Sequence, residues 1–140
     1  MITNHWKNLK RDIEFNISQH TFPSEYYLGF STTAPAEDGT GVSEPTQLSY
    51  ARKPIGTWEA QTEPGVAKNL NSIVFNETTG AWGTLTHLVI FDALTEGNLL
   101  MSCELAIPRI INQENMTLTA PIRSITIAQE GGESEVQTTL

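Results

Sequence analysis

The stretch TLTHLVIFDALTEGNLLMSCEL, residues 84–105, decides the fold class of this chain. Residues 84–91 are rich in β-branched and apolar side chains. The second half of this segment is apolar at consecutive positions, which is typical of a central strand buried on both faces. Residues 94–97, LTEG, form a short turn that contains glycine and leads into a second strand at 98–105. The stretch therefore predicts an antiparallel hairpin in the middle of a β structure.

Short strands separated by turn signals are predicted on both sides of this hairpin. They cover residues 26–33, 48–55, 72–75, 116–119 and 122–128. Breaker residues predict long loops at 36–46 and 56–71, and Pro108 is expected to end the strand before it. Pro54 favours a sheet edge or a strand end for 48–55, because proline donates no hydrogen bond to a neighbouring strand.

Many short strands with no helix between them predict an all-β fold, an antiparallel β-sandwich of jelly-roll-like type. The alternation of apolar and polar side chains predicts that one face of each outer strand meets the core. The expected buried positions include Leu88, Ile90, Leu99, Ile125 and Ile127.

The first residues carry a helical pattern that competes with a strand pattern. Apolar residues spaced by four, three, four and four would line one face of a helix. They are Ile2, Trp6, Leu9, Ile13 and Ile17. Ile13, Phe15 and Ile17 also alternate with polar residues, as in a strand. The longer stripe predicts a helix over about 4–17, and Pro23 closes the segment.

The patterns divide the chain into three parts. We expect an N-terminal helical arm at 1–22, a β-sandwich domain at 23–128 and a polar tail at 129–140 that is frayed or ordered by a partner. Because the arm lies outside the sandwich, its apolar stripe must be buried against something. The stripe Trp6, Leu9, Ile13 and Ile17 is therefore the candidate assembly interface.

Composition restricts the partners. The chain has 140 residues and a formal net charge of −8, which argues against a nucleic-acid surface and against an anionic membrane face. The longest near-apolar run, residues 87–93, is far shorter than a membrane-spanning helix. The start of the chain lacks the apolar stretch of a secretory signal, so we expect synthesis and folding in a reducing cytoplasm.

No cluster of reacting groups can be assembled from the sequence. The three histidines lack the spacing of metal ligands, so neither a metal nor a cofactor is expected. His87 is expected on the face that carries Leu85, Val89 and Phe91, as a hydrogen-bonding residue. The single cysteine, Cys103, excludes an internal disulfide and is expected to be a small buried apolar residue. We therefore expect a protein that is not an enzyme.

Two further residues have a plain interpretation and a functional one. Asp92 follows a strand, where a turn residue that bonds its own backbone is the simplest interpretation. Trp58 lies near turns and could stack on a sugar, although an aromatic side chain that closes one end of a sandwich is the commoner use. Trp58 is therefore a candidate ligand contact.

The order of motifs along the chain resembles a family of small bacteriophage tail-fibre-type virion proteins. An aromatic strand ends in Ala-Pro, a Gly/Asp loop precedes a Tyr-Ala-Arg strand, and a Trp-Gly-Thr strand continues into Ile-Phe-Asp-Ala and a Gly-Asn-Leu-Leu return. The resemblance spans about residues 1–127. The matching positions are 34–35, 50–52, 82–84, 86–87, 90–93 and 97–100.

The resemblance implies a structural protein of the virion with no catalytic residues to carry over. Its expected partners are other virion proteins of the tail or the capsid, so a tail-fibre or tail-tip component and a capsid-surface decoration both stay open. Likeness to fibre proteins implies a homo-oligomer, a trimer. The alternative is a carbohydrate-binding β-sandwich that attaches to a host-surface glycan through Trp58 or the loop at 36–46.

Overall fold

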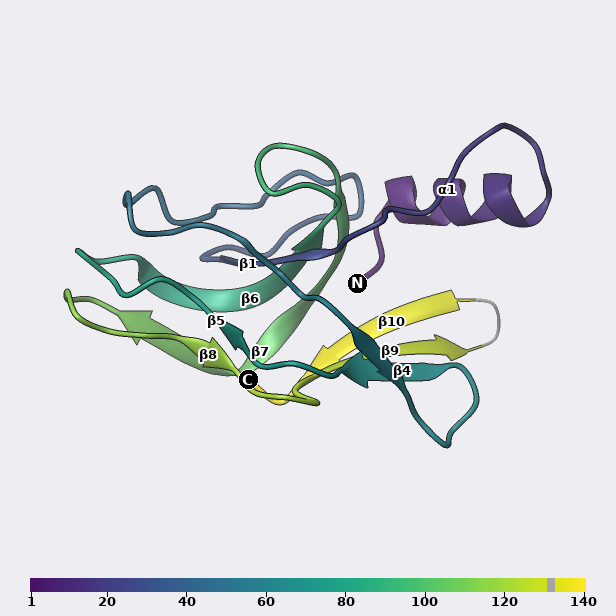
Figure 1. Cartoon of the computed structure of the whole chain (residues 1–140). Coiled ribbons are helices and arrows are strands. Elements are labelled where there is room, and N and C mark those ends of the chain that lie inside the picture. The colour runs from purple at the N-terminus through teal and green to yellow at the C-terminus, as the bar shows by residue number, and fades with distance from the viewer. Residues whose placement is uncertain (131–132) are drawn as a thin grey trace.

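The centre of the fold is the antiparallel pair β6 (Gly83–Phe91) and β7 (Leu99–Ile111), shown in Figure 1. The structure is a computed structural model that describes residues 1–130 and 133–140. The turn between the strands includes Gly97, whose φ of 71° is a left-handed conformation that favours glycine. The hairpin predicted for residues 84–105 is therefore confirmed, with a longer second strand.

Three antiparallel sheets build the described part of the chain. The order in the first is β2 (Lys53–Pro54), β1 (Tyr27–Ser31), β6 and β7. The order in the second is β10 (Glu133–Thr138), β9 (Ile125–Glu130), β4 (Val66–Asn69) and β3 (Trp58–Ala60). The third pairs β5 (Ile73–Val74) with β8 (Thr119–Ala120). The predicted all-β class is confirmed, and β2 lies at a sheet edge, as Pro54 predicts.

One apolar core connects these sheets. Leu88 and Ile90 of β6 and Ile125 of β9 are buried in it, as predicted, and Ile127 is half-buried against it. Val136 of β10 belongs to this core as well, so the second sheet packs on the first through the last strand of the chain. Leu99 of β7 is buried as well, but in a second, smaller cluster with Val89 and Phe91.

A break in the register of β6 and β7 corrects two expectations. Leu85 pairs with Arg109 and His87 pairs with Glu104, so residues 105–108 of β7 lie opposite Thr86 alone. The bulge places Leu85 in the core with Leu88 and Ile90, and not on the face of Val89. Pro108 lies within the bulge, where no ladder hydrogen bond is required of it, so β7 continues through the proline that was expected to end it.

Residues 56–71 form a hairpin instead of the predicted loop. β3 and β4 pair from Trp58 opposite Asn69 to Ala60 opposite Ala67. Pro64 and Gly65 lie in the turn between them, and Gly65 has a φ of 79°. The Pro-Gly signal therefore marks a tight turn within a hairpin and not a long irregular segment.

The end of the chain also differs from the expected polar tail. β10 pairs with β9 along its whole length, and Val136 and Leu140 are only 4% and 5% exposed. These two apolar side chains anchor the segment, while Glu135 and Gln137 between and beside them are exposed. The part of the expected tail at 131–132 lies outside the described residues.

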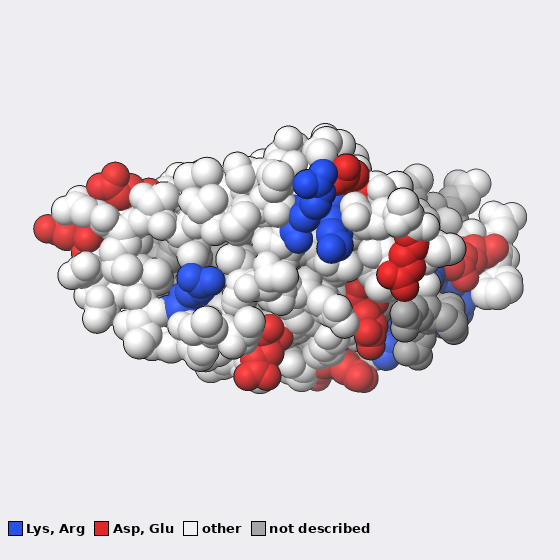
Figure 2. Space-filling view, turned by 90° about the horizontal axis from the view of Figure 1, so that it is seen from below, with Lys and Arg blue, Asp and Glu red and all other residues white. Residues whose placement is uncertain are grey.

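Charge is dispersed on the face of the molecule seen from below. Figure 2 shows Lys and Arg side chains and Asp and Glu side chains there as separate spots among other residues.

The single helix of the described residues, α1 (Asn4–Glu14), lies beside the sheets in Figure 1. No helix among the described residues has the length and apolar character needed to cross a membrane.

Candidate functional site

The N-terminal helix begins at a capping residue that also attaches it to the sheet. The Thr3 side chain accepts a hydrogen bond from the backbone N–H of Trp6 at 3.3 Å, and its hydroxyl donates to the Leu99 carbonyl at 2.7 Å. The helix ends at Glu14, three residues before the predicted end, because Asn16 adopts a left-handed φ of 52°. The predicted helix is confirmed, and the alternative strand at residues 13–17 is wrong.

The residues before the helix bind along β7. The α-ammonium group of Met1 donates to the Ser102 carbonyl at 2.5 Å, and the Ser102 N–H donates to the Met1 carbonyl at 2.9 Å. Ile2 forms a bridge with Met101, and the Thr3 N–H donates to the Leu100 carbonyl at 3.0 Å. The helix is therefore joined to its own domain and does not stand apart as an arm.

The four residues of the candidate assembly interface differ in burial, so they do not form one exposed surface. Trp6 is only 5% exposed and lies in the core, where its ring packs against Phe22 and Tyr26. Leu9 is half-buried against the same core, and Ile13 is also half-buried. Ile17 lies beyond the helix and is 62% exposed. Trp6 and Leu9 thus stabilise this chain's own fold, and Ile17 is the member of the stripe that is open to a partner.

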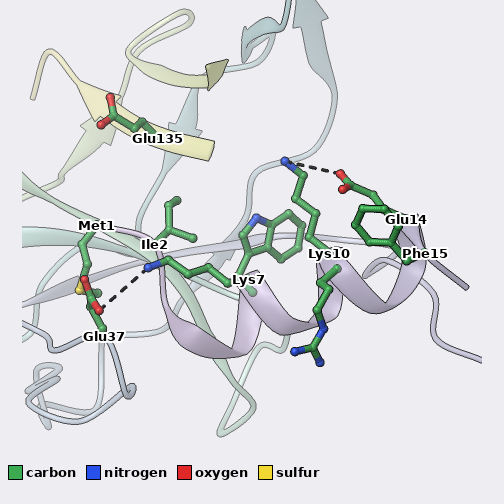
Figure 3. A pocket seen from close by; sticks show the side chains of 10 residues that line it. Met1, Ile2, Lys7, Lys10, Glu14, Phe15, Glu37 and Glu135 are labelled. Carbon is green, nitrogen blue, oxygen red and sulfur yellow. Dashed lines mark ion pairs between the residues drawn. The ribbon is translucent and has the colours of Figure 1, made fainter. Parts of the chain in front are cut away.

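A cleft of about 300 Å³ lies between α1 and β10. Figure 3 shows Lys7 and Lys10 on the helix and Glu135 on the strand across from them. The residues that line the cleft come from the N-terminus, the helix, one loop and β10. They are Met1, Ile2, Trp6, Lys7, Lys10, Arg11, Glu14, Phe15, Glu37 and Glu135.

The charges in this cleft are of both signs. Lys7 lies 4.0 Å from Glu37, and Lys10 lies 3.7 Å from Glu14, as the dashed lines in Figure 3 mark. Lys10 also donates to the Gln129 side chain at 2.8 Å. The Nε1 atom of Trp6 is buried and has no hydrogen-bond partner among the described residues. The cleft therefore combines paired charges with one buried donor that lacks an acceptor.

Trp58 lies outside this cleft, on β3. Its ring is half-buried and meets the Tyr26 ring edge-on, with 6.4 Å between centroids. Burial raises the pKa of Tyr26, in keeping with an aromatic cluster that packs one end of the sheets. This placement favours the packing role for Trp58 over the ligand contact.

The isolated histidine, cysteine and aspartate take structural positions. His87 Nδ1 lies 2.8 Å from the Thr86 hydroxyl. Burial raises the pKa of Cys103 to about 11, so its thiol is protonated near neutral pH. Asp92 accepts hydrogen bonds from the backbone and the side chain of Asn98, at 2.7 and 3.0 Å, as a turn residue does. Among the described residues, no group of three or more His, Cys, Asp or Glu side chains could hold a metal ion.

The structure contains a buried polar cluster that was not predicted from the sequence. Two of its residues, Tyr50 and Arg52, stand in the sequence analysis only as parts of the Tyr-Ala-Arg motif. Arg52 is 7% exposed, and its Nη1 donates to the carbonyls of Ala93 and Glu96 at 2.8 and 2.7 Å. The same guanidinium pairs with Glu44, which also accepts from the Tyr50 hydroxyl at 2.7 Å. The cluster attaches the loop at 36–46 to the turn of the central hairpin.

This cluster perturbs one titratable group. Burial, with the neighbouring Glu44 carboxylate, raises the pKa of Tyr50 above its usual range. The Tyr50 oxygen also accepts the Phe30 N–H at 3.0 Å, so the hydroxyl is both donor and acceptor inside the protein. Positions 50–52, 90–93 and 97–100 of the motif thus meet in one packing arrangement. One signal for this cluster was available in the sequence. Arg52 is a charged residue in the strand predicted at 48–55, and the turn at 94–97 is predicted as well.

These observations define a small β-sandwich whose polar clusters position loops and turns, with a helix at the edge of one sheet. A family model described as podophage GP4 fiber I protein gp80 matches residues 1–128, and the chain belongs to this family. It is therefore a structural protein of a bacteriophage virion, and the resemblance seen in the sequence is confirmed. A search of curated proteins found no match to the chain.

Proposed function

We propose that this protein is a non-catalytic component of a phage tail fibre, and not a capsid-surface decoration, which assembles through contacts with other virion proteins. The observation that carries the proposal is the family match over residues 1–128, because the description of this family names a fiber protein. The match covers the helix, the central hairpin and most of the second sheet. It leaves out β10.

The docking surface that we propose is the segment after α1, at residues 16–24. Ile17 and Phe22 in this segment are 62% and 44% exposed. Figure 1 shows the end of α1 and the loop that follows it at the outer limit of the molecule. Burying one apolar side chain of this size at an interface contributes about 1.5–3 kcal/mol before ordering costs, so the segment could anchor a neighbour.

The surroundings of the titratable groups support a non-catalytic role. Tyr50 and Cys103 carry raised pKa values, and both are explained by burial within packed regions. Such shifts mark a catalytic site only when a cleft and a reacting partner accompany them. Neither residue lines the cleft between α1 and β10.

We also propose that the protein is a homo-oligomer in the particle, a trimer, made in the host cytoplasm before assembly. A net charge of −8 keeps free subunits soluble and apart until a specific contact forms. Closed cyclic assemblies repeat the same contact patch around the ring, so one exposed apolar segment per subunit is sufficient for such an interface.

The test is incorporation of variants into particles. Ile17→Asp places a charge on the docking segment and should lower incorporation strongly, while the melting temperature of the purified chain stays unchanged because Ile17 is exposed. Leu48→Asp is the matched control, because Leu48 is 98% exposed and lies in another part of the chain. Equal incorporation of both variants and the parent protein would remove residues 16–24 as the docking surface.

A further inference from the structure

The turn between β6 and β7 is exposed, yet hydrogen bonds fix its shape. The side chains of Leu94 and Glu96 in this turn are exposed, Leu94 by 50%. The buried Arg52 guanidinium donates to the Glu96 carbonyl at 2.7 Å, and Asp92 accepts the Asn98 backbone N–H at 2.7 Å. These bonds hold Glu96 at a φ of 54°, a left-handed conformation that residues other than glycine rarely adopt. The turn is therefore preorganised, which lowers the entropy cost of docking on a partner.

Two residues of opposite charge lack a counterion within the described parts of the chain. Glu96 is the first, because its carboxylate has no ion pair and no hydrogen bond there. Arg109, near the end of β7, is the second, whereas Arg11, Arg52 and Arg123 each pair with a carboxylate. The Nε atom of Arg109 is buried, but its Nη1 and Nη2 atoms are not, so a carboxylate from outside can reach them.

Arg109 lies within an exposed apolar stretch at the edge of the first sheet. Ile107 and Ile110 are 67% and 61% exposed, and residues 105–113 contain no Asp or Glu. β7 is the last strand of its sheet, but the bulge and Pro108 disfavour the addition of another strand here. A partner therefore binds this stretch through side chains, with apolar contacts around one ion pair.

The turn and this stretch complement each other. The turn offers an exposed leucine beside a carboxylate, and the stretch offers two exposed isoleucines beside an arginine. They lie at opposite ends of β7, which Figure 1 lets the reader follow, so they cannot meet within one chain. Contact between two different surfaces repeats from copy to copy, and it closes into a ring when the rotation between copies allows.

We propose that the turn at residues 92–98 of one copy docks on residues 107–110 of a second copy of this chain. Glu96 pairs with the second copy's Arg109, and Leu94 packs on the second copy's isoleucines. This contact rests on the homo-oligomer proposed above and is additional to residues 16–24. It also gives a role to the buried Arg52, which fixes the turn in the shape that docks.

Disulfide trapping in assembled particles tests the contact and leaves the ion pair in place. Leu94→Cys and Ile110→Cys are combined in a chain whose own cysteine is removed by Cys103→Ala. Oxidation should then join copies into dimers and larger species on a denaturing gel, because each contact brings one cysteine of each kind together. Either new cysteine alone should give no such species. A lysine-reactive crosslinker applied to parent particles reports oligomers whatever their contact.

Charge reversal tests the ion pair. Glu96→Arg and Arg109→Glu should each lower incorporation into particles about tenfold, because like charges then face each other across the contact. The double variant should return to nearly the level of the parent protein. Glu77→Arg is the matched control, since Glu77 is exposed in another loop. Melting temperatures of the purified variants check folding, and Glu96→Arg changes only an exposed side chain.

Three results would overturn the inference. One is trapped species from either cysteine alone, and another is a double charge reversal no better than the single ones. The third is the lack of trapped species in particles where the lysine-reactive crosslinker finds oligomers, and in that case the homo-oligomer itself still stands. If that crosslinker finds single copies only, the homo-oligomer and this contact fail together.

Discussion

The guanidinium group of Arg52 donates two hydrogen bonds to the carboxylate of Glu44, at 2.9 and 2.8 Å, from a position that is 7% exposed. Such a two-point contact fixes the direction of both side chains. The Arg52 guanidinium also lies 3.5 Å from the centre of the Phe91 ring. It therefore holds a long loop against the hairpin that determines the fold.

Replacing one member of this pair should destabilise the fold strongly. Arg52→Met removes the guanidinium that donates to the Glu44 carboxylate and to two backbone carbonyls, and leaves Glu44 with the Tyr50 hydroxyl alone. We therefore expect a loss of about 3 kcal/mol in the free energy of unfolding. Denaturant unfolding measures the loss. Arg123→Met is the matched control, because Arg123 pairs with Glu59 at 2.9 Å on the surface and should change stability little. Equal effects of the two changes would contradict the structural role of Arg52.

Substitutions at two apolar residues, one in α1 and one at its end, should affect stability differently. Leu9 packs against the core and Phe15 is 72% exposed. Leu9→Ser should therefore lower the free energy of unfolding by about 1–2 kcal/mol, while Phe15→Ser should leave it nearly unchanged. Thermal unfolding of the two variants decides the matter. A larger loss for Phe15→Ser would indicate that residues 13–17 pair as a strand after all.

The last strand should be required for stability. Val136 is 4% exposed and belongs to the main core, so Val136→Ala should lower the free energy of unfolding by about 2 kcal/mol. Gln137, its neighbour on the exposed side of β10, provides the control in Gln137→Ala. If both variants unfold like the parent protein, β10 does not contribute to the core.

Cys103 should react slowly and should make stability depend on alkaline pH. Its thiol keeps its proton up to a pH of about 11 in the folded chain, whereas an unfolded cysteine ionises near pH ~8.5. The stability that comes from burying the neutral thiol is therefore complete below pH ~8.5 and is lost as the pH rises toward about 11.

Thiol labelling at pH 8 measures the protection of Cys103, and unfolding at a series of alkaline pH values measures the linked stability. Folded protein should label far more slowly than denatured protein. Cys103→Ala supplies the control, because its stability should fall less over the same alkaline range. Labelling of the folded chain at the rate of a free cysteine would contradict the burial of this thiol.

The sequence predicts those elements whose pattern is local. The run at 84–91 and the stripe that includes Trp6 and Leu9 each show their period within one segment, and both predictions are confirmed. The hairpin at 56–71 was missed because its strands are only three and four residues long and flank a Pro-Gly turn. No local pattern of that length separates a hairpin from a loop.

The candidate site depended on contacts that no local pattern contains. The stripe predicts an apolar helix face, but which surface covers it is decided by Thr3 and Met1, whose hydrogen bonds join the start of the chain to β7. The cleft needs β10, and β10 is anchored by Val136 and Leu140 in an otherwise polar segment. Both features join residues far apart in the sequence: Thr3 and Leu99 are separated by 96 positions, and Lys10 and Gln129 by 119.

We expect this family member to lie in the tail fibre of the virion. The most direct measurement is electron microscopy of purified particles labelled with an antibody against the chain, combined with averaging of the labelled structure. We predict label on the tail fibres, with density for three copies around the fibre axis. Label over the capsid surface, or purified infectious particles that lack the protein, would contradict the account.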